Sequence, residues 1–287
     1  MSKIDYVKKF LNCKRVEGCS ERSMIYYNYV LTDIVKYMID IVKYKKELID
    51  ITTDEIREYL FYLRDSRKNS MTTLDNVRRV LNSFYCWAED EDYIIKSPMR
   101  KIHKIKTEKI IKEAYTEEMI LKILETCPTI RDKAMVHFLL STGVRVGELV
   151  RLNKNDINWE DKEIKVFGKG NKERIVYFNH KTAKYLQRYL KSRKDDSPAL
   201  FVTERSPWNR MNIGGVEHRI RQLGIKAGLK NVYPHRFRRT FATMAIDKGM
   251  PIEQVQTLLG HEEIKTTQRY AMVKQKNVKI GYKRYME

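Results

Sequence analysis

The sequence predicts a mainly α-helical protein with one small β-sheet, made of a hairpin and a third short strand. Apolar residues recur three and four positions apart along most of the 287 residues, which is typical of helices that bury one face. The period changes to two in a single stretch, at about residues 157–177. Gly and Pro, which interrupt helices, number only 12 and 6.

Four helices are expected in the first hundred residues, at about 4–13, 20–41, 52–67 and 72–88. Thr52 and Glu55 have the spacing of a capping box, which predicts where the third helix begins. The fourth has a stripe of apolar residues three and four apart: Leu74, Val77, Leu81, Phe84 and Ala88. Ser97-Pro98 then ends the helical pattern, so we expect a first domain over 1–99.

Residues 100–112 carry six Lys and Arg residues against one Glu, and we expect an extended basic linker. A solvated spacer is the simplest interpretation. A cationic connector between two lobes also suits a protein that wraps a nucleic-acid duplex, because phosphates attract Lys and Arg. Lys101, Lys104 and Lys106 are the candidate contacts in this linker.

A second domain is expected over 113–287, with Thr116 as the N-cap of its first helix. Helices are predicted at about 117–126, 131–141, 144–151, 181–192, 212–227, 235–248, 252–259 and 264–270. Between them, Ile164, Val166, Ile175 and Tyr177 alternate with polar residues around residues 168–171, which predicts the hairpin, and a short strand is expected near Ile157. The tail, 271–287, could form one more helix.

The chain is strongly basic, with 57 Lys and Arg residues against 37 Asp and Glu and a formal net charge of +20. Residues 1–105 contribute +4 and residues 106–287 contribute +16. Such a surplus repels itself in a folded protein, so we expect a polyanionic partner, contacted mainly by the second domain. A membrane surface is a weaker explanation, because the basic residues are not confined to one amphipathic helix.

Localisation and redox state follow from simple exclusions. No run approaches the roughly 18 apolar residues of a membrane span, and the N-terminus lacks the apolar stretch of a signal peptide. Cys13, Cys19, Cys86 and Cys127 show no zinc-site spacing. We therefore expect a cytoplasmic protein with reduced thiols.

Chemically informative residues fall in four segments. Glycines flank Arg145 at a helix start, with Glu148 three residues on, and Lys169 lies on the glycine-rich hairpin tip. His235 and Arg238 share a helix face in a basic stretch. The fourth segment runs from the Leu-Leu-Gly-His stretch that ends at His261 to Tyr270, nine residues later. Each segment alone has a purely structural explanation, such as a turn or a surface charge.

Together, the ordered set Arg145, Lys169, His235, Arg238, His261 and Tyr270 resembles the tyrosine recombinases, or phage-type integrases. The hairpin stretch 168–174, the His-x-x-Arg helix and the Leu-Gly-His…Tyr ending are most similar to the small, Xer-type members. The resemblance covers nearly the whole chain. It implies a helical, SAM-like core-binding domain at 1–99 and the catalytic domain of the family at 113–287.

In this family resemblance, Tyr270 attacks a DNA phosphate and is left as a 3′-phosphotyrosine. Arg145 and Arg238 would clamp the phosphate, His261 would donate to it, His235 would accept a proton and Lys169 would protonate the leaving oxygen. Glu148 would orient Arg145 or serve as a surface ion-pair partner. Arg239 stands where many members have histidine, which leaves a second register in which Arg239 is the clamp.

The resemblance further implies double-stranded DNA with two recombination sites as substrate, a Holliday-junction intermediate and a homotetramer on DNA, with exchange of the tail 271–287 between subunits. Neither a metal nor another cofactor is expected. Further candidate DNA contacts are Lys172, Arg174, Arg236 and Arg239. Two alternatives remain from the residues: a type IB topoisomerase, which shares the chemistry, and a noncatalytic DNA-binding protein of the same fold.

Overall fold

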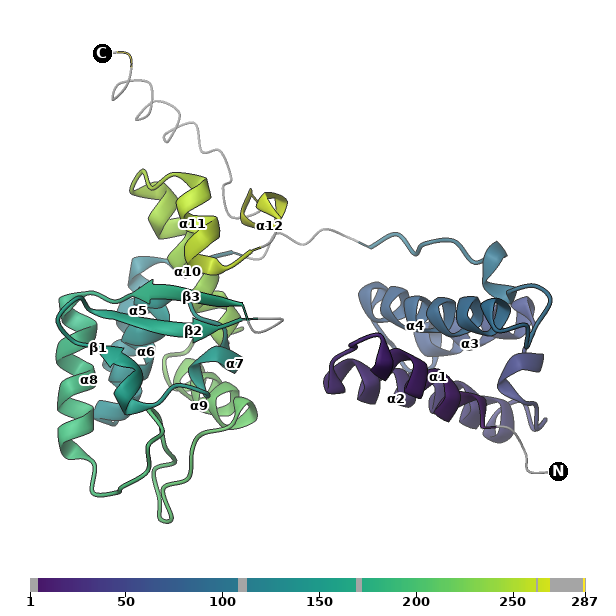
Figure 1. Cartoon of the computed structure of the whole chain (residues 1–287), viewed down its shortest axis with the longest axis horizontal. Coiled ribbons are helices and arrows are strands. Elements are labelled where there is room, and N and C mark those ends of the chain that lie inside the picture. The colour runs from purple at the N-terminus through teal and green to yellow at the C-terminus, as the bar shows by residue number, and fades with distance from the viewer. Residues whose placement is uncertain (1–4, 108–112, 169–171, 262, 269–285, 287) are drawn as a thin grey trace. The chain divides into compact units, whose positions relative to one another are not determined.

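The computed structural model describes residues 5–107, 113–168, 172–261, 263–268 and 286. The chain divides into two compact units, Met1–Ile111 and Lys112–Glu287, and each has its own buried core (Figure 1). Both units are mainly helical, and the second contains a three-stranded antiparallel sheet. This confirms the predicted fold class. Among the described residues, no helix is long and apolar enough to cross a membrane.

The N-terminal unit consists of α1 (Tyr6–Val16), α2 (Glu21–Asp40), α3 (Thr53–Asp65) and α4 (Met71–Asp90), with 3-10 turns at Leu48–Asp50 and Pro98–Lys101. Each of the four predicted helices forms. The capping box is present, because the Thr52 side chain accepts from the Glu55 backbone while the Glu55 carboxylate accepts from the Thr52 N–H. All five residues of the predicted α4 stripe are buried.

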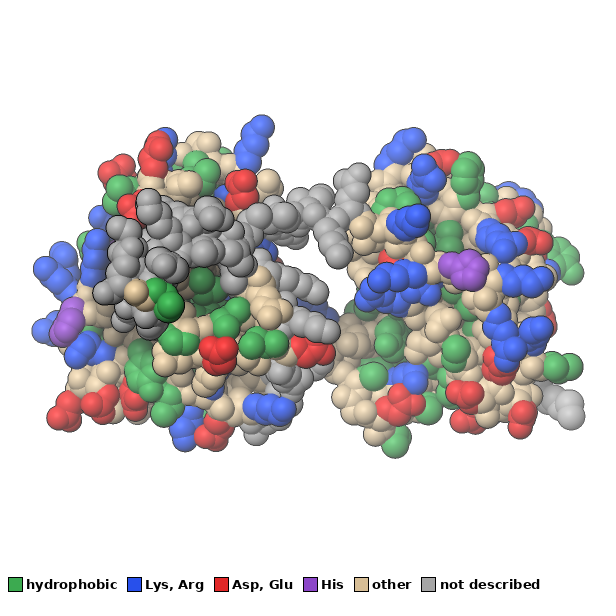
Figure 2. All heavy atoms as spheres, turned by 90° about the horizontal axis from the view of Figure 1, so that it is seen from above, with side chains coloured by type: hydrophobic (Ala, Val, Ile, Leu, Met, Phe, Trp, Pro, Cys, Tyr) green, Lys and Arg blue, Asp and Glu red, His purple; other side chains and the backbone are tan. Residues whose placement is uncertain are grey.

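The basic segment after α4 begins as part of this unit. Met99 is buried, Ile102 and Ile105 pack on the N-terminal core, and the Ile105 N–H donates to the carboxylate of Asp75 at 3.3 Å. The segment expected to be an extended linker is therefore held on the unit as far as about residue 105. Lys101, Lys104 and Lys106 are exposed. Figure 2 shows Lys and Arg side chains gathered on the face formed by α4 and this segment.

In the C-terminal unit, α6 packs between α8 and α10, and α11 lies against β3 (Figure 1). The eight helices predicted before the tail form, although the one expected at 144–151 is shorter, because Arg145 has extended backbone angles and acts as the N-cap. The helix suggested for the tail lies outside the described residues, apart from residue 286. The helices are α5 (Glu117–Glu125), α6 (Ile130–Thr142), α7 (Val146–Leu149), α8 (His180–Ser192), α9 (Ile213–Lys226), α10 (Pro234–Asp247), α11 (Ile252–Leu259) and α12 (Ile264–Gln268).

The sheet is formed by β1 (Ile157–Asn158), β2 (Glu163–Phe167) and β3 (Glu173–Tyr177), in that order. The hairpin and the third strand are thus confirmed, but the alternation within β3 has the opposite phase. Val176 is buried whereas Ile175 and Tyr177 are 43% and 53% exposed. Arg174 opposes buried Val166 in the β2–β3 register, so an arginine occupies the inner face of the sheet. The partners of that arginine, described below, explain the phase.

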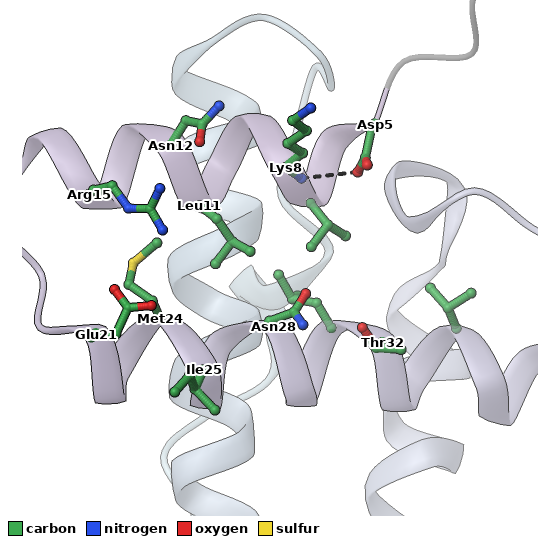
Figure 3. Close-up of a pocket in the computed structure, with 13 residues that line it drawn as sticks. Asp5, Lys8, Leu11, Asn12, Arg15, Glu21, Met24, Ile25, Asn28 and Thr32 are labelled. Atoms are coloured by element: carbon green, nitrogen blue, oxygen red, sulfur yellow. Dashed lines mark hydrogen bonds between the residues drawn. The ribbon is translucent and has the colours of Figure 1, made fainter.

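A groove of about 670 Å³ lies between α1 and α2 (Figure 3). Its lining includes the apolar side chains of Leu11 and Met24, and its charged lining residues are all exposed: Asp5, Lys8, Arg15 and Glu21. Charges in water are not tuned for proton transfer or for stabilising a transition state, because solvent screens them. The groove therefore does not have the character of an active site.

Candidate active site

Arg238 is the most deeply buried charged group of the candidate site. It extends from α10 with 1% of its surface exposed. Its Nη1 donates to the Gly143 carbonyl at 2.8 Å, and its Nη2 donates to the Leu259 carbonyl and to Nε2 of His261, the latter at 2.9 Å. A guanidinium has five donors in a rigid fork, so one side chain can join three segments in this way.

Gly143 gives Arg238 its first partner. It ends α6 with φ 61°, in the left-handed region, where a side chain is disfavoured. A Cβ at this position would lie 2.5 Å from the Phe241 ring, and 3.2 Å from Leu259 Cδ2. Both conditions require glycine. The turn that follows presents Arg145, which is why the sequence places a glycine immediately before this segment.

Arg145 and Glu148 form the second part of the site. The Glu148 carboxylate accepts from the Arg145 backbone N–H at 2.7 Å and from Arg145 Nη1 at 2.9 Å. Arg174 reaches the same carboxylate from β3, with two bonds of 2.7 Å. Burial alone would raise the pKa of Glu148, but the hydrogen bonds from Arg174 and Arg145 outweigh it and hold that pKa below its ordinary value. Glu148 is therefore ionised at neutral pH.

Gly260 brings the end of α11 to this cluster. Its φ of 62° ends the helix, and its carbonyl accepts from Arg145 Nη2 at 3.0 Å. A Cβ on Gly260 would lie 3.0 Å from Cδ of Arg174 and 3.2 Å from its Nη1. The Leu-Gly-His stretch thus needs glycine both for the turn and for the close approach of the arginine.

His261, directly after Gly260, is held between two partners. Arg238 always donates, so Nε2 of His261 accepts, and Nδ1 must carry the proton that bonds Thr267 Oγ1 at 2.9 Å. Burial lowers the pKa of His261 to about 4, and the positive charges of Arg238 and Arg145 act in the same direction. The ring is therefore neutral at pH 7. Thr267, fully buried on α12, is a site residue that the sequence analysis did not single out.

The remaining candidates divide into three groups. His235 is exposed at the first turn of α10, and Lys172 is exposed next to the hairpin tip. Arg236 was a predicted DNA contact, but its guanidinium donates to the backbone carbonyls of Glu113 and Ala114 and lies 4.3 Å from the Tyr115 ring centroid. Lys169 and Tyr270, the proposed acid and nucleophile, lie outside the described residues.

Arg174 and Arg239 also differ from exposed DNA contacts. The Arg174 side chain is 9% exposed and is joined to Glu148. Arg239 is half-buried, and its buried Nη1 has no hydrogen-bond partner in the part of the chain that the structure describes. Of the two adjacent arginines, Arg238 is the one that contacts His261.

The cluster has a clear electrostatic preference. Three guanidinium groups gather here, from Arg145, Arg174 and Arg238, and among the described residues their hydrogen bonds reach one carboxylate, that of Glu148, which binds Arg145 and Arg174. Buried charge of one sign is costly unless an opposite charge arrives, so the site favours an anion. Arg145, with 37% of its side chain exposed, is the group through which an anion can enter.

Comparison with protein families identifies the family of the chain. The model of the phage integrase family matches residues 113–277, and that of the phage integrase N-terminal SAM-like domain matches residues 7–95. The chain belongs to the phage integrase family. Membership makes it a tyrosine recombinase, an enzyme of the class that cleaves and rejoins DNA. This confirms the resemblance seen in the ordered motifs.

Its relatives include Xer recombinases. Tyrosine recombinase XerC of Leptospira interrogans is 32% identical, over 96% of this chain and 91% of its own length. Tyrosine recombinase XerD of Oceanobacillus iheyensis is 30% identical, over 97% of each. XerA of Pyrococcus horikoshii is 31% identical, over 96% of this chain and 91% of its own length.

Solved structures have the same fold. A crystal structure of XerA recombinase is 28% identical and covers 99% of this chain and 98% of its own, with a TM-score of 0.55. The Tn1549 transposon integrase in complex with transposon right end DNA has a TM-score of 0.78 at 20% identity, over 99% and 100% of the chains. A lambda integrase tetramer bound to a Holliday junction has a TM-score of 0.73 at 19% identity, over 90% and 76%.

Proposed function

We propose that this protein is a site-specific DNA recombinase that exchanges strands through a covalent 3′-phosphotyrosine at Tyr270. The observation that carries the proposal is a positively charged cluster suited to bind an anion. Arg145, Arg238 and His261 converge in it from the α6–α7 turn, α10 and the end of α11. These are three of the six residues that the family pattern assigns to the scissile phosphate. A cytoplasmic location is part of the proposal, because the protein must meet its DNA.

The two arginines act on the phosphate. As the Tyr270 oxygen forms its bond to phosphorus and the bond to the 5′ oxygen breaks, negative charge grows on the nonbridging oxygens. Arg145 and Arg238 stabilise that charge, and comparable arginines in phosphoryl transfer contribute roughly 10³–10⁵ in rate. Burial strengthens the contribution of Arg238, because water does not screen it.

The histidines move protons. Tyr270 has an ordinary pKa of about 10 and must lose its proton on attack, and His235 is the proposed acceptor. In the DNA-free protein, Nε2 of His261 is an acceptor for Arg238. A bound phosphate competes for Arg238 and its negative charge favours protonation of the imidazole, so His261 becomes a donor to the same phosphate.

Lys169 is the proposed general acid for the departing 5′ oxygen. Lys169→Ala should slow cleavage by roughly 10²–10⁴, because an alkoxide is a poor leaving group without a proton. A substrate with sulfur at the 5′ bridging position should restore the rate, since a thiolate leaves unprotonated. Single-turnover cleavage of the two substrates measures the effect. Lys172→Ala, in the same hairpin, is the control and should show no selective rescue by sulfur. Equal losses on both substrates would reduce Lys169 to a DNA contact.

The proposed substrate is a pair of duplex sites held by four protomers. The surplus of basic charge supports DNA as the partner, and exposed Lys101, Lys104 and Lys106 on the N-terminal unit are proposed phosphate contacts. The proposed subunit link is the tail 271–287, of which only Met286 lies among the described residues. Its Val278, Tyr282 and Tyr285 are spaced four and three apart, as on one face of a helix that docks on a neighbour.

Truncation after Met272 should leave binding to a single site unchanged and abolish synapsis of two sites, because the tail is the proposed link between protomers. Gel shifts with one-site and two-site DNA measure both. In the full-length chain, Val278→Ser with Tyr282→Ser should reproduce the defect, whereas Lys279→Ser, off the apolar face, is the control. Normal recombination by the truncated chain would rule out docking, and its unfolding would show that the tail packs on its own domain.

The proposed function is tested by strand exchange. Wild-type protein is first incubated with a pool of random duplexes and then denatured. The DNA that stays attached to the protein contains the sites that it cleaves. Two captured duplexes of different length are then incubated with the protein. A recombinase yields duplexes of two new lengths and a four-way intermediate. An adduct with relaxed plasmid but no exchange would indicate a topoisomerase, and binding without an adduct a noncatalytic protein.

A further inference from the structure

Arg174 has a place in the fold that does not suit a DNA contact. It lies on the inner face of β3, opposite buried Val166. Its Nε donates to the Leu258 carbonyl at 2.7 Å, and Nη1 and Nη2 each donate to Glu148 at 2.7 Å. A two-bond contact between guanidinium and carboxylate fixes both groups in plane and is stronger than a single charged hydrogen bond.

The partners of Arg174 are themselves held to the candidate active site. Glu148 binds both the backbone N–H and Nη1 of Arg145. Leu258 lies two residues before Gly260, whose carbonyl accepts from Arg145 Nη2 at 3.0 Å. A closed ring of contacts therefore runs from Arg174 through Glu148 to Arg145, on to Gly260 and back along the chain through Leu258. It joins β3, the α6–α7 turn and the end of α11.

We propose that Arg174 is a positioning residue of the strand-transfer site, which orients Arg145 through Glu148 and orients the turn that carries His261 through Leu258. The inference rests on the proposed function and adds a residue outside the set that touches the phosphate. The third strand of the sheet thus fixes the geometry of groups on two helical segments. It also explains the phase of β3, because the inner face must present Arg174 to Glu148.

The ion pair between Arg174 and Glu148 predicts that the cleavage rate of an Arg174 variant depends on pH, which loss of ordinary packing would not cause. Among the described residues, two charged side chains bind Glu148: Arg145 from its own turn and Arg174 from β3. Burial raises the pKa of Glu148, and Arg174 is the stronger of the two arginines that lower it. Without Arg174, the pKa of Glu148 should rise, so the carboxyl should gain a proton at a higher pH than in the wild type, and a protonated carboxyl holds Arg145 less well.

The experiment compares Arg174→Gln with the wild type in single-turnover cleavage at saturating protein, from pH 5 to pH 8. Cleavage should fall on the order of 100-fold, as expected for a misplaced reacting group, while the Kd for DNA stays within about threefold because many phosphate contacts remain. The rate relative to wild type should rise with pH. In Arg174→Gln with Glu148→Gln, that relative rate should be independent of pH, because no carboxylate remains to titrate.

Arg193→Gln is the matched control. Arg193 is also buried in an ion pair, with Asp195, and also donates to backbone carbonyls, those of Ala199 and Ser197. It should lower the unfolding temperature without changing the cleavage rate of folded protein. Arg174→Lys keeps the charge but not the fork, so it should cleave slowly with no new dependence on pH. It also serves if Arg174→Gln does not fold.

Three outcomes would decide against the proposal. Wild-type cleavage by folded Arg174→Gln or Arg174→Lys would leave Arg174 a stabilising residue only. If the loss of DNA affinity accounted for the loss of cleavage, Arg174 would be a DNA contact and not a positioning residue. An acid-sensitive rate that persists in the double variant would assign the titration to another group. If the wild-type protein forms no adduct, the proposed function itself fails, which is a different result.

Discussion

Tyr270→Phe should remove all covalent protein–DNA adduct and leave DNA binding nearly unchanged. The phenol oxygen is the proposed nucleophile, and phenylalanine has the same ring without it. Affinity for DNA comes from many phosphate contacts spread over a chain with net charge +20, so the loss of one hydroxyl should change Kd little. A denaturing gel of protein incubated with labelled substrate measures the adduct, and a gel shift measures binding.

Tyr282→Phe is the control for this experiment, because Tyr282 is a second tyrosine in the basic C-terminal tail. It should form adduct at the wild-type level on a single-site substrate. The opposite pattern, an adduct that persists in Tyr270→Phe and disappears in Tyr282→Phe, would assign the nucleophile to Tyr282. It would also break the match to the family's ordered pattern at its last residue.

Arg238→Lys should slow cleavage by at least roughly 10³, the lower end of the effect of arginines in phosphoryl transfer. Arg238 is 1% exposed and bonds the Gly143 and Leu259 carbonyls and His261 at once. A lysine ammonium cannot span these partners, and each buried carbonyl left without a donor costs about 1–3 kcal/mol of folding free energy. Single-turnover cleavage and thermal unfolding measure the two effects separately.

Arg239→Lys is the neighbouring variant for comparison. It should weaken DNA binding, yet the saturated complex should cleave within about tenfold of the wild-type rate, because Arg238 and not Arg239 contacts His261. If instead Arg239→Lys abolished cleavage and Arg238→Lys did not, the clamp would belong to Arg239. That result would revive the second register left open by the sequence.

The sequence predicted the helices because their signals are local. The α4 stripe, the capping box at Thr52 and Glu55, and the glycine that ends α11 each lie within a few residues of the feature they determine. The candidate site was predicted in a different way, from the order of reactive residues along the chain. That order identifies Arg145, Arg238 and His261 without showing that they meet.

What the sequence missed are contacts between distant segments. Arg174 and Glu148 are 26 residues apart, and no local pattern links them, so the predicted phase of β3 was wrong. The signal that could have corrected this is the parity of Arg174 with Val176 and Phe178, both buried. Thr267 was missed because no local pattern links it to His261. The hydrogen bond between them, from His261 Nδ1 to Thr267 Oγ1, is 2.9 Å long.

The most direct test of the central claim is to find the atom that holds the DNA. Wild-type protein is incubated in excess chelator with a captured site that carries a nick. The nick makes the fragment with the free 5′-hydroxyl short, so it dissociates after cleavage and the adduct cannot be religated. The adduct is digested with protease and nuclease and sequenced by mass spectrometry. We expect a nucleotide joined to Tyr270 through its 3′ phosphate, and full yield with chelator present. A nucleotide on another residue, a 5′ linkage, or no adduct until metal is added would contradict it.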